Sequence, residues 1–273
     1  RRLAAELGIA LEHVTGSGPH GRVMSEDVRV FAQLRSRPAP AAATVGAIQP
    51  DETVPHTNMR KTIAKRLKAS YLDAPTFFLT ANLACDNMVA FRSQMKAAGV
   101  KVSYNDIVIK AVARALRDVP EVNASWADDA ITRHGRVDIG MAVALDGGLI
   151  TPVIRNADTL GLATIAASTR ELAGRARELK LRPEEYQNST FTISNLGMMQ
   201  IEEFTAIINA PNSGILAIGA LQQVPVVVDG ALTVGWRMKV TMTCDHRVID
   251  GALGATFLQA VRKYIENPAL LAA

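Results

Sequence analysis

The sequence predicts an α/β protein in which a mixed β-sheet carries helices, preceded by a small helical domain. Two observations predict this class. Helical and extended patterns alternate over most of the 273 residues. The extended segments also outnumber the strands of a single parallel strand–helix–strand array, and short turns join several of them. We therefore expect parallel and antiparallel strands in one sheet, with helices on one face.

Composition narrows the function classes. Hydrophobic residues make up 48% of the chain and aromatic residues 5%, and the net charge of +4 is spread along the sequence. No block of Lys and Arg indicates nucleic-acid binding, and no apolar run reaches the ~18–20 residues of a membrane span. The two cysteines, Cys85 and Cys244, form no CxxC pair, which favours a reducing compartment.

Residues 1–34 contain two short helical patterns around a glycine-rich turn. Leu3 and Leu7 have i, i+4 spacing, and Ser25 is a good N-cap for a second helix. The turn at 15–22, "TGSGPHGR", lacks the lysine and preceding strand of a phosphate-binding P-loop. About 35 residues make a marginal mini-domain. Its expected core consists of Leu3, Leu7, Val14, Val28 and Phe31.

An Ala- and Pro-rich segment over residues 35–54 is typical of a mobile linker. The third part, 55–273, holds the alternating elements. Its expected helices are 59–73, 103–119 with Ser103 as N-cap, 164–181 and 251–268. Its expected strands are 76–85, a hairpin within 137–157 through Asp146–Gly148, 189–197, 214–221, 224–234 with a turn at Asp229–Gly230, and 237–246.

The stretch "TMTCDHRVIDGALGATFL", residues 241–258, places charged groups between an apolar strand and an apolar helix. Such groups are costly to bury unless they pair or react. The plain interpretation of His246 and Asp250 is a surface pair at a helix start. The position between a strand end and a helix start favours a catalytic interpretation of His246. An imidazole titrates near neutrality and so suits proton abstraction from a thiol.

Two further residues have both a structural and a chemical interpretation. Ser194 ends the strand "FTISNLG", where it either satisfies backbone groups or donates to a developing oxyanion. Arg60 begins a basic helix, where it is either solvated or the cation that holds Asp250. A metal site is not expected, because no Cys/His cluster completes a shell around Cys244 and His246. A serine hydrolase would need G-x-S-x-G, which is absent.

Several motifs together carry a family resemblance. "DHRVIDGA" resembles the signature of the dihydrolipoamide acyltransferase (E2) catalytic domain of 2-oxo acid dehydrogenase complexes. "VPHTNMRKTIAKRL", "YNDIVIKAVARAL", "GLITPVIRNAD", "FTISNLGM" and "FTAIINAPNSGILAIGA" resemble E2 blocks in the expected order, and residues 1–34 resemble its peripheral subunit-binding domain. The resemblance covers nearly the whole chain except the linker. It implies a chloramphenicol-acetyltransferase-like fold that assembles as a homotrimer within a larger core of 24 or 60 subunits.

The resemblance also assigns roles to residues. His246 would be the general base, Asp250 its supporting aspartate and Ser194 the oxyanion donor from the neighbouring subunit, with Arg60 pairing the aspartate. Coenzyme A and an acylated lipoyl group, carried on a lipoyl domain absent from this chain, would meet in a channel between subunits. In the small domain, Arg1 and Arg22 match basic residues that grip E1 or E3.

The acyl group is expected to be acetyl, since "RVIDGALGATFL", "PEVNASW" and "IINAPNSGILAIGA" are nearer the pyruvate-type enzymes than the succinyl type. Branched-chain and acetoin-derived groups stay open. A non-catalytic E2-like scaffold that binds E3 or E1 is the alternative from another class, and an amine or antibiotic acetyltransferase is disfavoured. The chain opens on "RRLAAELG" without Met or a signal peptide, and so is interpreted as a fragment or processed chain. The expected compartment is the cytoplasm of a bacterium or the mitochondrial matrix.

Overall fold

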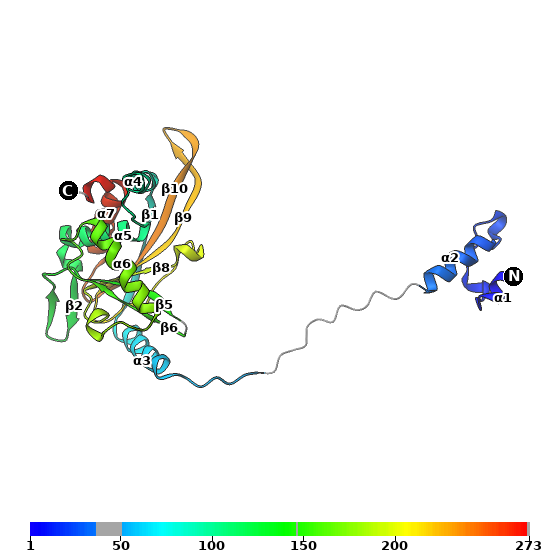
Figure 1. Cartoon of the computed structure of the whole chain (residues 1–273), viewed down its shortest axis with the longest axis horizontal. Coiled ribbons are helices and arrows are strands. Elements are labelled where there is room, and N and C mark those ends of the chain that lie inside the picture. The colour runs from blue at the N-terminus through cyan, green and yellow to red at the C-terminus, as the bar shows by residue number, and fades with distance from the viewer. Residues whose placement is uncertain (37–50, 146, 272–273) are drawn as a thin grey trace. The chain divides into compact units, whose positions relative to one another are not determined.

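The computed structural model describes residues 1–36, 51–145 and 147–271. The chain divides into two compact units, Arg1–Val54 and Pro55–Ala273. The first contains two helices and the second contains the sheet (Figure 1). Most of the expected linker, 35–54, lies outside the described residues.

The small unit is built from helices α1 (Arg2–Glu6) and α2 (Ser25–Ser36). Two turns of 3-10 helix, Leu11–His13 and Pro19–Gly21, lie between them. The expected place of Leu7 in the core is wrong: its side chain is 48% exposed, because α1 ends at Glu6 and the i, i+4 pattern does not continue. The buried core consists of Ala4, Ile9, Val14 and Val28, with Leu3 and Phe31 partly buried against it.

A carboxylate holds the glycine-rich turn of the small unit against the start of α2. The side chain of Asp27 accepts hydrogen bonds from the backbone N–H of Ser17 at 2.9 Å and of Met24 at 2.8 Å, and from the Ser17 hydroxyl at 2.7 Å. These bonds, led by the one from Ser17 N–H, lower the pKa of Asp27. The expected N-cap, Ser25, is instead the first residue of the helix.

The large unit contains five α-helices and ten strands among the described residues. The helices are α3 (Asn58–Asp73), α4 (Asp86–Ala97), α5 (Tyr104–Asp118), α6 (Leu162–Arg177) and α7 (Gly251–Glu266). The strands are β1 (Thr76–Ala84), β2 (Ala124–Ala127), β3 (Ala130–Arg133), β4 (Ile139–Met141), β5 (Val143–Leu145), β6 (Gly148–Ile150), β7 (Val153–Ile154), β8 (Phe191–Asn195), β9 (Gly214–Val228) and β10 (Ala231–Asp245). None of the helices described is long and apolar enough to cross a membrane.

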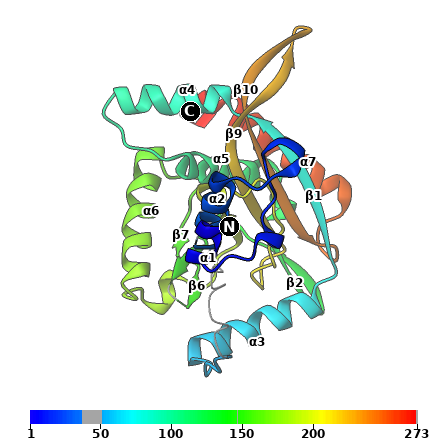
Figure 2. The ribbon, with the colours of Figure 1, turned by 90° about the vertical axis from the view of Figure 1, so that its right-hand side faces the viewer.

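The principal sheet has the order β1-β10-β9-β8-β4-β7. The pairs β9–β8 and β8–β4 are parallel, and the other neighbours are antiparallel. The expectation of a mixed sheet is therefore confirmed. β9 and β10 form one long hairpin through Asp229–Gly230, and its outer end extends beyond the rest of the sheet (Figures 1 and 2).

The apolar core lies between the sheet and the helices α5 and α7. α5 is buried nearly all round, as its apolar composition predicts, and α7 packs against both α5 and β1. The N-terminus of α5 is a capping box: the Ser103 hydroxyl accepts from Asp106 N–H, and the Asp106 carboxylate accepts from Ser103 N–H. The largest fully buried side chains include Leu83, Ile107, Leu116, Phe191, Leu216 and Phe257.

The sequence pattern misplaces some elements and misses others. The expected strands 214–221 and 224–234 are not separate: β9 runs through Pro225 to Val228, and β10 continues to Asp245 with a bulge between Met238 and Val240. Pro225 is tolerated there because this part of β9 pairs with β10 alone. The sequence pattern predicted neither helix α4 nor the β2–β3 hairpin. Within 137–157 the hairpin pairs β5 with β6, and Asp146, which follows β5 in the sequence, lies outside the described residues.

Candidate active site

His246 follows the last residue of β10, where the chain leaves the sheet. Its backbone N–H donates to the carbonyl of Pro75 at 2.9 Å, so the residue stays attached to the chain just before β1. Its imidazole packs against the ring of Phe77, with centroids 4.5 Å apart. The side chain is exposed in the single chain. The histidine is thus presented at the surface from a rigid strand end.

A buried ion pair fixes the turn around His246. Asp245 is 4% exposed, and its carboxylate accepts from the backbone N–H of Arg247 at 3.0 Å and from the guanidinium at 2.7 Å. The same guanidinium reaches Asp73 at 3.2 Å and lies 5.1 Å from the ring centroid of Trp126. The hydrogen bonds that the guanidinium donates to Asp245 raise the pKa of Arg247. Asp245 and Arg247 thereby anchor the residue between them, a role that the sequence analysis missed.

Asp250 caps the helix that follows. Its Oδ1 accepts a hydrogen bond from the backbone N–H of Leu253 at 2.8 Å, which is the geometry of an N-cap for α7. The residue itself is exposed. Arg60 lies in the first turn of α3, where its backbone N–H donates to the Thr57 hydroxyl at 3.1 Å. Within the described residues of one chain, no ion pair joins Arg60 to Asp250 or to any other carboxylate.

Ser194 lies on β8, beside Ala217 of β9, and is partly buried. The next residue, Asn195, ties this strand end to its surroundings. Its amide donates to Asn105 Oδ1 at 3.1 Å, while its Oδ1 accepts from the backbone N–H of Gly197 at 2.8 Å. These bonds fix the backbone around Ser194, and the motif "SNLG" alone gave no signal that Asn105 is the partner.

Within one chain, the sheet register keeps Ser194 away from His246. Ser194 is level with Ala217, which is level with Thr241 of β10, and His246 lies five residues further along. With about 3.3 Å per residue along a strand and about 4.8 Å between strands, their Cα atoms are roughly 20 Å apart. This distance is far more than the two side chains can bridge. The structure does not bring the expected base and oxyanion donor together in a single copy.

In the small unit, Arg1 and Arg22 line the same cavity. Its volume is about 310 Å³, and Leu3, Leu11 and Val23 contribute apolar surface to it. Both arginines are exposed. The structure thus places two cations, far apart in the sequence, around one hollow of the small unit.

Around these positions, the described residues contain neither a candidate metal cluster nor an exposed thiol. Among the described residues, no group of three or more His, Cys, Asp or Glu side chains is arranged to hold a metal ion. Cys85 and Cys244 are buried free thiols, and burial raises the pKa of each to about 12.

The fold and the matching sequence model define the class of protein. The structure aligns with chloramphenicol acetyltransferase at a TM-score of 0.51 and 18% identity, over 74% of this chain and 94% of that one, which shows a shared fold. Residues 48–273 match the family described as 2-oxoacid dehydrogenases acyltransferase (catalytic domain), and residues 1–29 match the e3 binding domain. The chain belongs to the 2-oxoacid dehydrogenase acyltransferase family, as its motifs indicated.

Named relatives agree with this assignment. The acetyltransferase component of the pyruvate dehydrogenase complex of Rhizobium meliloti is 43% identical over 98% of this chain, and the mitochondrial one of Schizosaccharomyces pombe is 44% identical over 98%. The chain spans 66% and 59% of the length of these two relatives. The relatives therefore include bacterial and mitochondrial proteins.

Two solved structures share both fold and sequence. The cubic core of a pyruvate dehydrogenase multienzyme complex aligns with a TM-score of 0.78 at 34% identity, over 86% of this chain and 98% of that one. Azotobacter vinelandii dihydrolipoamide acetyltransferase aligns with a TM-score of 0.79 at 33% identity, over 82% and 95%. In the latter, a serine, a histidine and an asparagine were investigated for their role in the catalytic mechanism.

Proposed function

We propose that this chain transfers an acetyl group between S-acetyl-dihydrolipoamide and coenzyme A, as a dihydrolipoyllysine-residue acetyltransferase that also builds the core of a 2-oxo acid dehydrogenase complex. The observation that carries the proposal is the rigid presentation of His246 between the paired Asp245 and Arg247. A base held in one orientation at a strand end is what thiol deprotonation requires.

The spacing of site residues supports the assignment. In the Azotobacter vinelandii enzyme, the investigated serine and histidine are 52 positions apart, and the asparagine follows the histidine by four. Ser194, His246 and Asp250 have the same spacing here, with an aspartate in place of the asparagine. Both side chains can cap a helix, so the substitution is compatible with the N-cap seen in this structure.

In the proposed reaction, His246 removes the proton of the coenzyme A thiol. The thiolate attacks the thioester carbon of S-acetyl-dihydrolipoamide, and the Ser194 hydroxyl donates to the oxyanion of the tetrahedral intermediate. Collapse of the intermediate breaks the bond to the lipoyl sulfur, which takes the proton back from His246. Acetyl-coenzyme A and dihydrolipoamide leave, and no acyl-enzyme forms because both substrates meet in one site.

The active site is proposed to lie between two copies of the chain. The roughly 20 Å between Ser194 and His246 in one copy leaves a neighbouring subunit as the source of the serine. In the same assembly, Arg60 of one copy would pair with Asp250, an ion pair that a single copy does not form. A homotrimer that builds a core of 24 or 60 subunits satisfies this requirement, and the cubic-core relative supports it.

The remaining partners follow from the small unit and the relatives. We propose that Arg1 and Arg22, which both line the 310 Å³ cavity, hold acidic groups of E1 or E3. The lipoyl group would arrive on a separate lipoyl domain. The three-part division into 1–34, 35–54 and 55–273 is part of this proposal, as is a location in the bacterial cytoplasm or the mitochondrial matrix.

The deciding experiment follows acetyl transfer from acetyl-coenzyme A to free dihydrolipoamide. We expect His246→Ala to lower kcat by about 10²–10⁴-fold, since a positioned acid–base group contributes that much, with particle mass unchanged. His13→Ala, which removes an exposed histidine of the small unit, is the matched control and should keep wild-type kcat. Unchanged turnover in His246→Ala would reject the base.

The same assay separates the acyl groups and the alternative function. Succinyl- and isobutyryl-coenzyme A are tested beside acetyl-coenzyme A, and the acetyl group should give the highest kcat/KM. A preference for isobutyryl-coenzyme A would instead assign the chain to the branched-chain acyltransferases. A wild-type particle of correct mass that transfers none of the three groups would instead favour the non-catalytic scaffold.

A further inference from the structure

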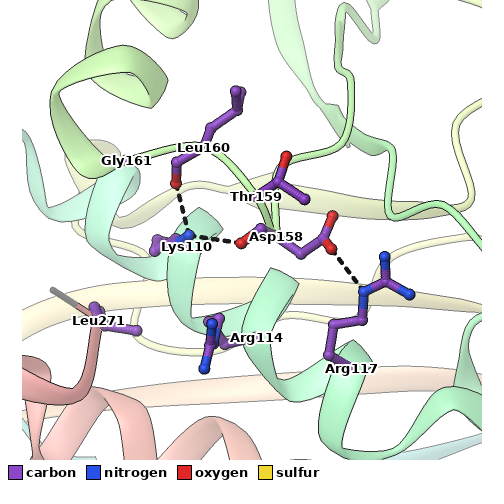
Figure 3. A pocket seen from close by; sticks show the side chains of 8 residues that line it. All are labelled: Lys110, Arg114, Arg117, Asp158, Thr159, Leu160, Gly161 and Leu271. Carbon is purple, nitrogen blue, oxygen red and sulfur yellow. Dashed lines mark hydrogen bonds and ion pairs between the residues drawn. The ribbon is translucent and has the colours of Figure 1, made fainter. Parts of the chain in front are cut away.

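A second cavity, lined by none of the residues of the proposed reaction, lies between α5 and the start of α6 (Figure 3). Its volume is about 400 Å³, within the ~300–1,000 Å³ typical of small-molecule sites. No residue of this cavity has a role in the acyl transfer proposed above. The lining residues are Lys110, Arg114, Arg117, Asp158, Thr159, Leu160, Gly161 and Leu271.

The cavity has an excess of positive charge. Lys110, Arg114 and Arg117 are spaced i, i+4 and i+7 on α5, so they lie along one face of the helix. Asp158 is the only carboxylate among the described lining residues. Three cations and one anion leave a formal excess of two positive charges.

Two of the three cations have partners in the protein. The ammonium of Lys110, a residue only 5% exposed, donates to the backbone carbonyls of Asp158 at 2.8 Å and Leu160 at 2.6 Å. Burial lowers the pKa of Lys110, and the charge of Arg114 lowers it further. Arg117 donates to Asp158 Oδ2 at 2.6 Å and to the Gly135 carbonyl at 2.9 Å. These contacts give Lys110 and Arg117 structural roles.

The contacts of Arg114 and Asp158 are incomplete. The Nε of Arg114 is buried and has no hydrogen-bond partner among the described residues, and the same is true of Asp158 Oδ1, whose residue is 7% exposed. Figure 3 shows the guanidinium of Arg114 with no bond to the other lining residues. Buried polar groups are nearly always satisfied, so a buried donor and a buried acceptor without partners, on two residues that line one cavity, set this region apart.

The first turn of α6 adds to the attraction for anions. This helix has 16 residues, and its N-cap, Gly161, has no side chain to accept from the first N–H groups. Free N–H groups and the helix dipole favour a negative charge at this end. The helix terminus and Arg114, whose guanidinium has no hydrogen bond to the other lining residues, border the same cavity.

We propose that this cavity binds the phosphate group of a small molecule, held by Arg114 and the N-terminus of α6. A phosphate monoester carries about −1.5 to −2 charges at pH 7, which matches the excess of two, whereas a single carboxylate does not. The volume leaves room for the organic part of the molecule.

Isothermal titration of the whole chain with inorganic phosphate, at ionic strength held constant with sodium chloride, tests the proposal. Arg114→Gln should weaken phosphate binding about tenfold or more, the typical contribution of a charge-assisted hydrogen bond. Arg177→Gln, which removes an exposed arginine at the other end of α6, should bind as the wild type does. No binding to the wild type, or equal binding to Arg114→Gln, would overturn the proposal.

A second variant guards against misfolding of the first. Gly161 has an extended backbone, and an added Cβ would meet no atom within 4 Å, so Gly161→Asp should fold and cap α6 with its own carboxylate. That carboxylate should abolish phosphate binding. Retained binding would contradict the site.

Acetyl transfer distinguishes this site from the one proposed for the reaction. Both Arg114→Gln and Gly161→Asp should keep the wild-type KM for coenzyme A, which itself carries phosphate groups. A KM that rises with the loss of phosphate binding would place the cavity in the substrate site and overturn its independence. A raised KM in these two variants would count against the independence of the phosphate site only. The proposed function is tested separately, by the kcat of His246→Ala.

Discussion

At residue 245, a carboxylate that is almost fully buried organises the exposed histidine beside it. Asp245 holds both the backbone and the guanidinium of Arg247, and its own carbonyl accepts from the N–H groups of Val248 and Ile249. The turn that carries His246 is therefore bonded on both sides. Such a turn limits the reorganisation that the proposed reaction at His246 would require.

We expect Asp245→Ala to lower the free energy of unfolding by about 3–5 kcal/mol, the usual cost of removing one partner of a buried ion pair. kcat should fall as well, because His246 loses its fixed position. Denaturant titration of the whole chain measures the first effect. Asp73→Ala is the control: this outer partner of Arg247 is 74% exposed, so its loss should cost less than about 1 kcal/mol. Equal costs for the two variants would contradict the anchoring role.

Substitutions at Asp250 separate its capping role from its charge. Asp250→Ala should destabilise α7 by about 1 kcal/mol, while Asp250→Asn keeps the cap. If the carboxylate also pairs with Arg60 of a neighbouring copy, Asp250→Asn lowers kcat at unchanged thermal stability. Arg60→Gln should then give the same kinetic defect, with no added effect in the double variant. Additive losses would exclude the pairing.

The candidate site residues could be predicted from the sequence only in part. His246, Asp250 and Ser194 lie in local sequence motifs, so the sequence alone is enough to propose their chemical roles. Asp245 also stands in the motif, but its partners at positions 73 and 126 are brought to it by folding. The cavity next to Arg114 was missed for the same reason. The sequence shows cations on a largely buried helix, α5, but not that folding brings Gly161 of another segment beside them.

Among the elements, the long amphipathic or fully apolar segments were predictable and the short ones were not. α5 and α7 follow from their apolar pattern, and the turns at Asp229–Gly230 and near Gly147 follow from their residues. The two-strand hairpin β2–β3 has four residues per strand, and β3 is exposed, so it shows no apolar alternation. The strand order of the sheet depends on distant pairings that no local pattern contains.

Asp27 makes the small helical unit sensitive to acid. The folded state lowers the pKa of Asp27 below its ordinary value of 3.8 through the N–H groups of Ser17 and Met24. The resulting stabilisation is fully present above pH ~4 and is lost as the pH falls through the folded-state pKa. Asp27→Asn should remove this pH dependence and lower the melting temperature of residues 1–36 at pH 7, which NMR resonances of the whole chain can follow.

Glu26→Gln, which changes the neighbouring exposed carboxylate of the same helix turn, is the control for Asp27→Asn. It should leave the melting of residues 1–36 at pH 7 unchanged. Acid unfolding of the small unit with the same midpoint in Asp27→Asn as in the wild type would show that other groups control it.

For the whole molecule, the register of the sheet bears on the shared site proposed above. Ser194 and His246 are roughly 20 Å apart in one copy, so each copy would give its histidine to one site and its serine to another. A particle built from two inactive variants can therefore contain intact sites. Such complementation is a direct test of the shared site.

Chains carrying His246→Ala and chains carrying Ser194→Ala, unfolded together in equal amounts and refolded, should regain about one quarter of wild-type activity. Random assembly into closed rings gives each interface one chance in four of combining an intact histidine with an intact serine. Each variant refolded alone is the control and should stay inactive. Absence of recovery, in mixed particles of correct mass, would place both residues of a site in one copy.

The burial of Cys85 and Cys244 has a consequence for any protein that handles activated acyl groups. An accessible thiolate on such a catalyst would itself accept acetyl from acetyl-coenzyme A by thioester exchange. The acetyl group would then remain bound to a cysteine of the protein. With the pKa of both thiols raised to about 12 and neither exposed, self-acylation is suppressed. Neither cysteine is therefore expected to accept an acyl group, and in the proposed reaction the reacting thiols are those of coenzyme A and dihydrolipoamide.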